Sequence, residues 1–340
     1  MLLFHCPNCR NRLYFENSQC GRCGATVGYE LGGNRFVCIG EDWQYCANAA
    51  RGACNWVVPA GAASPFCLSC RLNEVIPPID DPVQQRRWVE VETAKRRLVY
   101  GLWRQSLPVV PRAEAADGLA FRILVDHAHG GAGDVSMGHE AGVITIDASE
   151  ADSWERESRR VELQEPFRTL LGHMRHESGH YYWDRLVAPT RWLDDFRARF
   201  GDERADYAAA MSAYYNGGPP PDWQATHISA YATMHPWEDW AETWAHYLHM
   251  VDAVETAAAS GFWQPVRADG SAEGAMPAAD FDSVYQRWEA VQLAMNSMNR
   301  SLGHNDFYPF VVSDAAREKL RFVHDVVSDW RERHGSSRAA

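Results

Sequence analysis

Apolar residues recur at helical spacing in several stretches of the chain. The first stretch, residues 82–108, begins and ends with proline, which favours a helix that starts at residue 82 and stops at residue 108. We expect the two Arg-Arg pairs of this helix, residues 86–87 and 96–97, to lie on its solvated face. Its apolar stripe consists of Trp88, Val91, Leu98 and Leu102.

Two later stretches, residues 165–187 and 236–254, have the same periodicity. The earlier one starts at Glu165-Pro166 and ends ahead of Pro189, while the later one starts at Pro236. Further helices are predicted around residues 205–216, 280–300 and 313–330. The apolar stripe of the 236–254 helix consists of Trp237, Trp240, Ala241, Trp244, Leu248 and Val251.

Two short segments read as strands instead. Residues 119–126 and 142–149 are rich in β-branched and aromatic side chains, and a glycine-rich loop separates them. Because these strands come before a long helix, we predict an α+β fold, in which a small β-sheet is flanked by a mainly helical domain. The proline-rich segment "EVIPPIDDP" is read as a linker. The predicted organisation is a cysteine-rich head at 1–75, a linker and helix at 76–112, and a main domain at 113–335.

Composition narrows the possible partners. The chain has 340 residues, 46% of them hydrophobic, and a formal net charge of −12. This charge argues against nucleic-acid binding, which depends on clustered Lys and Arg. No apolar run reaches the ~18 residues of a membrane span, and the first residues do not resemble a secretion signal. We therefore expect a cytoplasmic protein that does not bind membranes.

All nine cysteines lie between residues 6 and 70. In a reducing compartment such a cluster predicts metal binding rather than disulfides. Cys6-Pro7-Asn8-Cys9 and Cys20-Gly21-Arg22-Cys23 are two Cys-x-x-Cys pairs. We expect their thiolates to hold one structural Zn²⁺, because four thiolates leave no coordination position for water.

The remaining cysteines predict a second structural zinc site. Cys67 and Cys70 form a third Cys-x-x-Cys pair, and we select Cys46 and Cys54 as its partners. Cys38 could replace either of these partners; in the favoured scheme it is a small buried residue. The head is nearly neutral, so a structural role or contact with a protein partner is favoured over nucleic-acid binding.

Within the helix predicted at 165–187 lies "HESGH", which is a His-Glu-x-x-His motif. His176 and His180 are four residues apart, so they project from one helix face and could share one metal ion. Glu177 lies beside them, where its carboxylate can act on a metal-bound water. The motif therefore predicts a catalytic zinc site with Glu177 as general base.

A catalytic zinc needs a third protein ligand. On the 236–254 helix, Glu238, Glu242 and His246 share one polar face at intervals of four residues. We select Glu238 as the ligand and Glu242 as the carboxylate that accepts a hydrogen bond from a ligand histidine. The reverse assignment stays open at this point.

Several longer stretches resemble a bacterial family of zinc-binding metallopeptidases with an N-terminal zinc ribbon. They include "CPNCRNRLYFENSQCGRCG", "CLSCRLNEVIP", "RHESGHYYWDRL", "HPWEDWAETWAHYLH" and "MNRSLGHNDFYPF". The resemblance implies a zincin-like peptidase domain behind a metal-bound head. The Glu238–Glu242 stretch also resembles the second active-site helix of gluzincins. That likeness implies that Tyr231 lies near the scissile carbonyl, although His235 could take this position instead.

The predicted function is therefore zinc-dependent hydrolysis of peptide bonds in a peptide or protein substrate, with one catalytic and two structural Zn²⁺ ions. In this scheme a zinc-activated water attacks the peptide, and Glu177 removes its proton. The alternative is a non-catalytic adaptor that binds proteins through its zinc ribbons and carries a structural third zinc. The substrate, the choice between endo- and exopeptidase, and the oligomeric state do not follow from the sequence.

Overall fold

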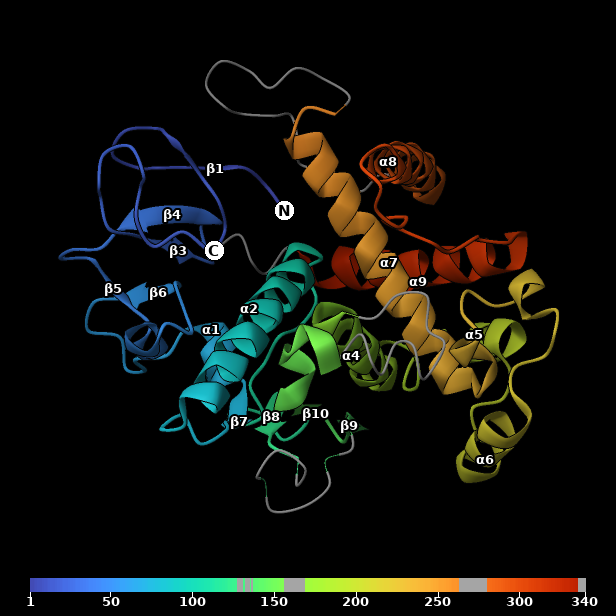
Figure 1. Cartoon of the computed structure of the whole chain (residues 1–340). Helices are drawn as coiled ribbons and strands as arrows, with labels where there is room; N and C mark the ends of the chain where they lie inside the picture. Colours follow the sequence, from blue (N-terminus) through green and yellow to red (C-terminus); the bar gives the residue numbers. More distant parts are fainter. Residues whose placement is uncertain (127–130, 132–134, 136, 156–168, 263–279, 336–340) are drawn as a thin grey trace. The chain divides into compact units, whose positions relative to one another are not determined.

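The computed structural model describes residues 1–126, 131, 135, 137–155, 169–262 and 280–335 (Figure 1). Two compact units make up this part of the chain. The first holds residues 1–102, 109–155 and 255–262, and the second holds residues 103–108, 169–254 and 280–335. The boundaries predicted from the sequence at residues 75 and 112 stay predictions.

The cysteine-rich head belongs to the first unit and is built from three antiparallel strand pairs. These are β1 (Phe4–His5) with β2 (Arg12–Leu13), β3 (Val27–Glu30) with β4 (Arg35–Cys38), and β5 (Trp43–Tyr45) with β6 (Val57–Pro59). A 3₁₀ helix, η1 (Ala47–Arg51), and a short helix, α1 (Leu68–Arg71), complete it. Its core is aromatic and consists of Phe4, Phe15, Tyr29, Phe36 and Trp56, all at most 5% exposed.

A four-stranded sheet with the order β7-β8-β10-β9 also belongs to the first unit. The two predicted strands appear as β8 (Ala120–Leu124) and β10 (Val143–Asp147), which pair in parallel. The sequence pattern did not predict β7 (Asn73–Val75), parallel to β8, or β9 (Gly138–Glu140), antiparallel to β10. The 3₁₀ helix η3 (Ala148–Ala151) follows β10.

Helix α2 (Pro82–Arg104) starts at the predicted proline. The expectation that both Arg-Arg pairs are solvated is wrong, because one arginine of each pair, Arg87 and Arg96, is buried. Arg87 forms an ion pair with Asp152, with 2.6 Å between Nη2 and Oδ2, and Arg96 donates to the carbonyl oxygen of Ala53. The helical pattern identified the apolar stripe but not these long-range partners of the arginines.

The described part of the second unit is helical. It contains α4 (Leu170–Leu186), α5 (Leu193–Phe200), α6 (Tyr207–Gly217), most of α7 (Pro236–Ala259), α8 (Phe281–Ser301) and α9 (Asp314–His334). Two 3₁₀ turns, η4 (Trp223–Ala225) and η5 (Tyr231–Thr233), lie between α6 and α7. Its core includes Trp183, Phe196, Trp240, Trp244 and Phe322.

The predicted α+β class, with a cysteine-rich metal-binding head and a mainly helical domain, is confirmed. Helix α7 starts at the predicted Pro236, whereas α4 begins at Leu170. The predicted start of that earlier helix at Glu165 lies outside the described residues. Among the helices of the described residues, none combines the length and the apolar character that crossing a membrane requires.

Candidate metal centre

Helix α4 carries the His-Glu-x-x-His motif. The side chain of Thr169 caps the helix by accepting a hydrogen bond from the backbone N–H of Gly172 at 3.0 Å. The four-residue spacing brings the rings of His176 and His180 onto one face, with 5.2 Å between their centroids. The two imidazoles thus lie one helical turn apart, as the motif predicts.

Glu238 of α7 meets both imidazoles. Its Oε2 lies 2.9 Å from Nε2 of His176, and its Oε1 lies 3.6 Å from Nε2 of His180. The side chain of Glu238 is only 3% exposed, so this carboxylate depends on these neighbours for the hydrogen bonds it loses with water. Together His176, His180 and Glu238 offer one metal-ligand atom each, all within 4.8 Å of one another.

The donor set and its geometry fit a zinc ion. Zn–N and Zn–O bonds of about 2.0–2.2 Å put the ligand atoms of a tetrahedral site roughly 3.3–3.6 Å apart. The observed separations of 2.9 and 3.6 Å bracket this range, so small side-chain adjustments would admit the ion. Two imidazoles and one carboxylate are also a ligand set typical of catalytic zinc, since a fourth position stays open.

Glu242 lies one turn after Glu238 and contacts the other nitrogen of the same imidazole. Its Oε1 is 2.7 Å from Nδ1 of His176, and its Oε2 accepts a hydrogen bond from Oγ of Ser229 at 2.6 Å. A carboxylate at Nδ1 favours the tautomer whose Nε2 carries a lone pair for a metal. These are the contacts expected of a carboxylate that orients a ligand histidine.

The two helices can approach closely because Gly179 lies at their crossing. A Cβ on Gly179 would come within 2.9 Å of Cα of Ala241. Indole N–H groups from α7 add two hydrogen bonds to α4: Trp240 donates to the carbonyl oxygen of Gly179 at 2.8 Å, and Trp244 donates to Oγ of Ser178 at 3.1 Å. These contacts fix the histidines of α4 against the carboxylates of α7.

Burial and hydrogen bonding shift the pKa values of the carboxyl groups at this site in opposite directions. Burial raises the pKa of Glu177 above its ordinary value of 4.5, although His176 and His180 act against this rise. Burial also disfavours ionisation of Glu238 and Glu242, but hydrogen bonds from the histidines outweigh it and lower the pKa of both carboxyls. Glu177 is thus the carboxyl of this group whose pKa is raised, whereas Glu238 and Glu242 favour the ionised form.

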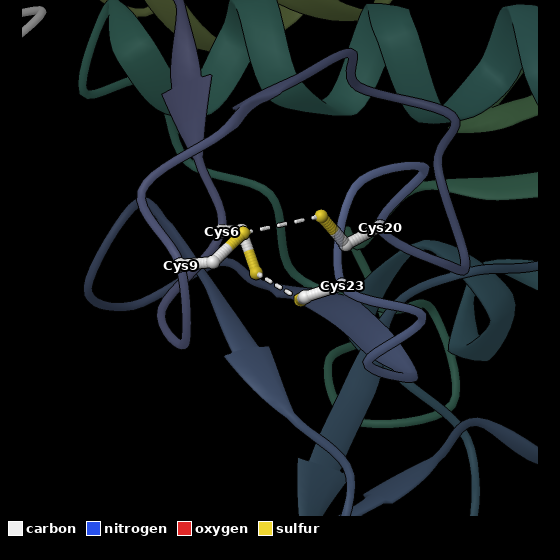
Figure 2. A group of neighbouring side chains, drawn as sticks. All are labelled: Cys6, Cys9, Cys20 and Cys23. Atoms are coloured by element: carbon white, nitrogen blue, oxygen red, sulfur yellow. Dashed lines mark hydrogen bonds between the residues drawn. The ribbon is translucent and has the colours of Figure 1, made fainter.

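Two cysteine groups in the head form separate clusters. Figure 2 shows the thiols of Cys6, Cys9, Cys20 and Cys23 turned toward one another. The sulfur of Cys6 lies 3.7 Å from that of Cys23, and the sulfur of Cys9 lies 3.6 Å from that of Cys20. These separations suit four thiolates around one tetrahedral zinc.

The second cluster consists of Cys46, Cys54, Cys67 and Cys70, all of which are buried. The sulfurs of Cys54 and Cys67 are 3.7 Å apart. This grouping coincides with the favoured scheme, whereas the expectation that Cys38 is buried is wrong, since that thiol is exposed at the end of β4. Within β4, Phe36 and Val37 are buried, whereas Arg35 and Cys38 at the two ends of the strand are exposed.

Comparison with known proteins agrees with the metal-ligand chemistry. The sequence profile of a family described as "Putative zinc-binding metallo-peptidase" matches residues 84–326, and a zinc-ribbon domain profile matches residues 3–81. The chain belongs to this metallopeptidase family. Three uncharacterized proteins, one from Mycobacterium bovis and two from strains of Mycobacterium tuberculosis, are each 46% identical to it over 330 residues. The matches cover 96% of this chain and 95% of each relative, and no solved structure matches it.

The two residues predicted for the oxyanion position have different surroundings in this metallopeptidase. The ring of Tyr231 lies 6.0 Å from that of His176. By contrast, His235 uses both ring nitrogens on backbone groups: Nδ1 accepts from the N–H of Trp237 at 3.2 Å, and Nε2 lies 3.1 Å from the carbonyl oxygen of Ala205. His235 thus contacts the backbone at the start of α7, whereas the ring of Tyr231 lies beside that of His176.

The sequence pattern did not predict two residues that lie at the candidate metal centre. The hydroxyl of Tyr207 donates to Oε1 of Glu238 at 3.0 Å, and Ser229 donates to Glu242. Tyr207 is the first residue of α6, whose alanine- and tyrosine-rich sequence has no polar stripe to indicate a site. Ser229 lies in the irregular segment before η5, where no periodicity applies.

Proposed function

We propose that this metallopeptidase family member hydrolyses peptide bonds, with His176, His180 and Glu238 as ligands of a catalytic zinc and Glu177 as general base. The observation that carries the proposal is the convergence of three ligand atoms beside a carboxyl of raised pKa. Peptide or protein is the substrate class that the family supports. Two structural zincs in the head complete the proposed metal content.

Each residue has a defined task in the proposed mechanism. A bound Zn²⁺ would act as a Lewis acid toward the substrate carbonyl and its own water. Glu177 takes the proton of the attacking water and returns it to the leaving amine, for which its raised pKa is suited. Glu242 keeps Nδ1 of His176 protonated and the ring in place. The Tyr231 hydroxyl donates a hydrogen bond to the developing oxyanion.

The adaptor alternative differs from this proposal in one respect that can be measured. If the third zinc only stabilises the fold, the carboxyl of Glu177 has no chemical task. If the protein is a peptidase, removing the base should slow hydrolysis without removing the metal, because Glu177 is not among the proposed ligands. Glu177→Gln keeps the size of the side chain and therefore separates the two functions.

We expect zinc-loaded Glu177→Gln protein to keep its metal content and to cleave a fluorogenic peptide library about 10²–10⁴-fold more slowly than the wild type. Asp194→Asn, which removes an exposed carboxylate from the first turn of α5, is the matched control and should retain wild-type rates. Equal rates in the wild type and in Glu177→Gln would contradict the proposed base. A wild-type protein that holds three zincs and cleaves no peptide in the library would favour the adaptor.

A further inference from the structure

Helix α6 is apolar in sequence, yet none of its residues is buried. Core packing therefore contributes little to its position, and its first turn supplies specific contacts instead. The side chain of Asp206 caps the helix by accepting from the N–H of Ala209 at 3.0 Å. The next residue, Tyr207, packs its ring against that of His235, with 5.2 Å between the centroids.

Tyr207 connects this helix to the proposed metal ligand. Its hydroxyl donates to Oε1 of Glu238 at 3.0 Å, while Oε2 of the same carboxylate faces Nε2 of His176 at 2.9 Å. One hydroxyl of α6 thus contacts a carboxylate oxygen of the proposed metal ligand.

This arrangement has a chemical consequence for the carboxylate. A hydrogen bond to one oxygen of a ligating carboxylate restrains its rotation and leaves the other oxygen directed at the metal. At Glu238 the restrained oxygen is Oε1, which lies 3.6 Å from Nε2 of His180, and Oε2 is the oxygen nearer to His176. The two carboxylates of α7 would then have different supports, with Ser229 donating to Glu242 and Tyr207 donating to Glu238.

We propose that Tyr207 is a positioning residue of the metal centre, whose hydroxyl holds the Glu238 carboxylate in place. This inference rests on the proposed zinc site at His176, His180 and Glu238. It assigns α6 a role in metal retention that its lack of buried residues does not suggest.

The test measures zinc release from the folded, fully loaded protein to a chelator in excess. Tyr207→Phe keeps the ring that packs on His235 and removes only the hydroxyl. The His176→Ala/His180→Ala protein defines the release that comes from the cysteine sites alone. Tyr215→Phe, which removes a hydroxyl from a residue of α6 that is 63% exposed, is the matched control.

We expect zinc bound at the histidine site to be held about 10–100-fold more weakly in Tyr207→Phe, with release from the cysteine sites and from Tyr215→Phe unchanged. Unchanged release in a Tyr207→Phe protein that melts like the wild type would overturn the proposal. Should Tyr207→Phe fold poorly, Tyr207→His, which can also donate a hydrogen bond, should restore both the fold and part of the metal retention. A Tyr207→His protein that folds but holds the zinc no more tightly than Tyr207→Phe would also contradict the proposal.

A second readout uses turnover with zinc in excess, so that metal loss no longer contributes. If Tyr207 acts by holding Glu238, the activity that Tyr207→Phe loses at limiting zinc should be largely regained when zinc is in excess. A loss of kcat that excess zinc does not change would contradict a role in metal retention. If the histidine site binds no zinc at all, the result is different, because the His176→Ala/His180→Ala protein would then hold as much zinc as the wild type.

Discussion

His176 is the residue on which the contacts of the candidate site converge. Its Nε2 faces Glu238 and its Nδ1 faces Glu242, so two carboxylates one turn apart on α7 meet opposite sides of one ring. The sequence predicted both carboxylates as a polar line and favoured Glu238 as the ligand, with the reverse assignment still open. Spacing alone could not decide this, because the answer depends on how far α4 is rotated against α7.

Other residues of the site do not belong to a polar line on a helix face and therefore did not stand out in the sequence. Tyr207 and Ser229 reach the carboxylates from segments without a polar periodicity. Conversely, His235 was considered for chemistry, but its ring nitrogens contact the backbone at the start of α7. Local patterns identify candidate ligands that share a helix face; they do not identify partners from segments that lack such a pattern.

His246 offers a prediction on the pH dependence of stability. This side chain is 7% exposed, its Nδ1 lies 2.5 Å from the hydroxyl of Tyr308, and burial lowers its pKa from 6.5 to about 4. The unfolded chain binds the proton more readily, so the folded state loses stability as the pH falls from 6.5 towards 4. At pH 5 this loss amounts to about 2 kcal/mol relative to pH 7.5.

In His246→Gln we expect the decrease in unfolding free energy between pH 7.5 and pH 5 to be about 2 kcal/mol smaller than in the wild type. The measurement is urea denaturation at both pH values, followed by tryptophan fluorescence. Comparing the two proteins cancels the other groups that titrate in this range. The same pH dependence in both proteins would mean that His246 does not titrate as its burial predicts.

Among the secondary-structure elements, the periodic pattern located α4 and α7, the two helices that carry the candidate metal ligands. The start of α7 at Pro236 and the motif within α4 follow from apolar spacing and from proline. The extra strands β7 and β9 did not follow from the sequence, because each has only three residues. β7 pairs with a strand distant in sequence, and β9 lies at the end of the segment read as a glycine-rich loop and pairs with β10 directly after it. Short strands are stabilised by their partners more than by their own composition.

The contact between α4 and α7 predicts the effect of enlarging Gly179. An added Cβ would lie 2.9 Å from Cα of Ala241 and 3.3 Å from Cβ of Trp244, so the helices would have to separate. We expect Gly179→Ala to lower the free energy of unfolding by about 1–3 kcal/mol. It should also weaken zinc binding at the histidine site, because ligands from both helices would move apart.

Gly217→Ala, at the end of α6, is the control for Gly179→Ala. An added Cβ at residue 217 meets no atom within 4 Å, so we expect little loss of stability. Denaturation of both variants and chelator titration of their zinc would measure the effects. If the Gly179→Ala protein is as stable as the wild type and retains its zinc equally well, the contact between α4 and α7 can accommodate an added Cβ and this prediction is wrong.

The nine cysteines of the chain divide into two groups of four and one separate residue, Cys38. The Cys-x-x-Cys pairs indicated the first group, and Cys67 and Cys70 indicated part of the second. The exposure of Cys38 could not be read from the sequence, since a small thiol at a strand end suits either environment. The composition of the head nevertheless predicted its metal-binding character well.

We expect Cys38→Ser to leave the zinc content of the purified protein unchanged and Cys54→Ser to lower it by one ion per chain. The sulfur of Cys54 lies 3.7 Å from that of Cys67 inside a buried cluster, so its loss opens the coordination shell. Elemental analysis of both variants measures this directly. Loss of one zinc in Cys38→Ser would mean that the second cluster uses a different set of cysteines.

In the proposed mechanism, the helices α4 and α7 hold a zinc ion separate from those of the head. Zinc stoichiometry by elemental analysis, on the wild type and on the His176→Ala/His180→Ala protein, tests for this ion. We predict three zinc ions per chain in the wild type and two in the variant. Two zinc ions in both proteins would contradict the claim, because the histidine site would then bind no metal in the purified protein.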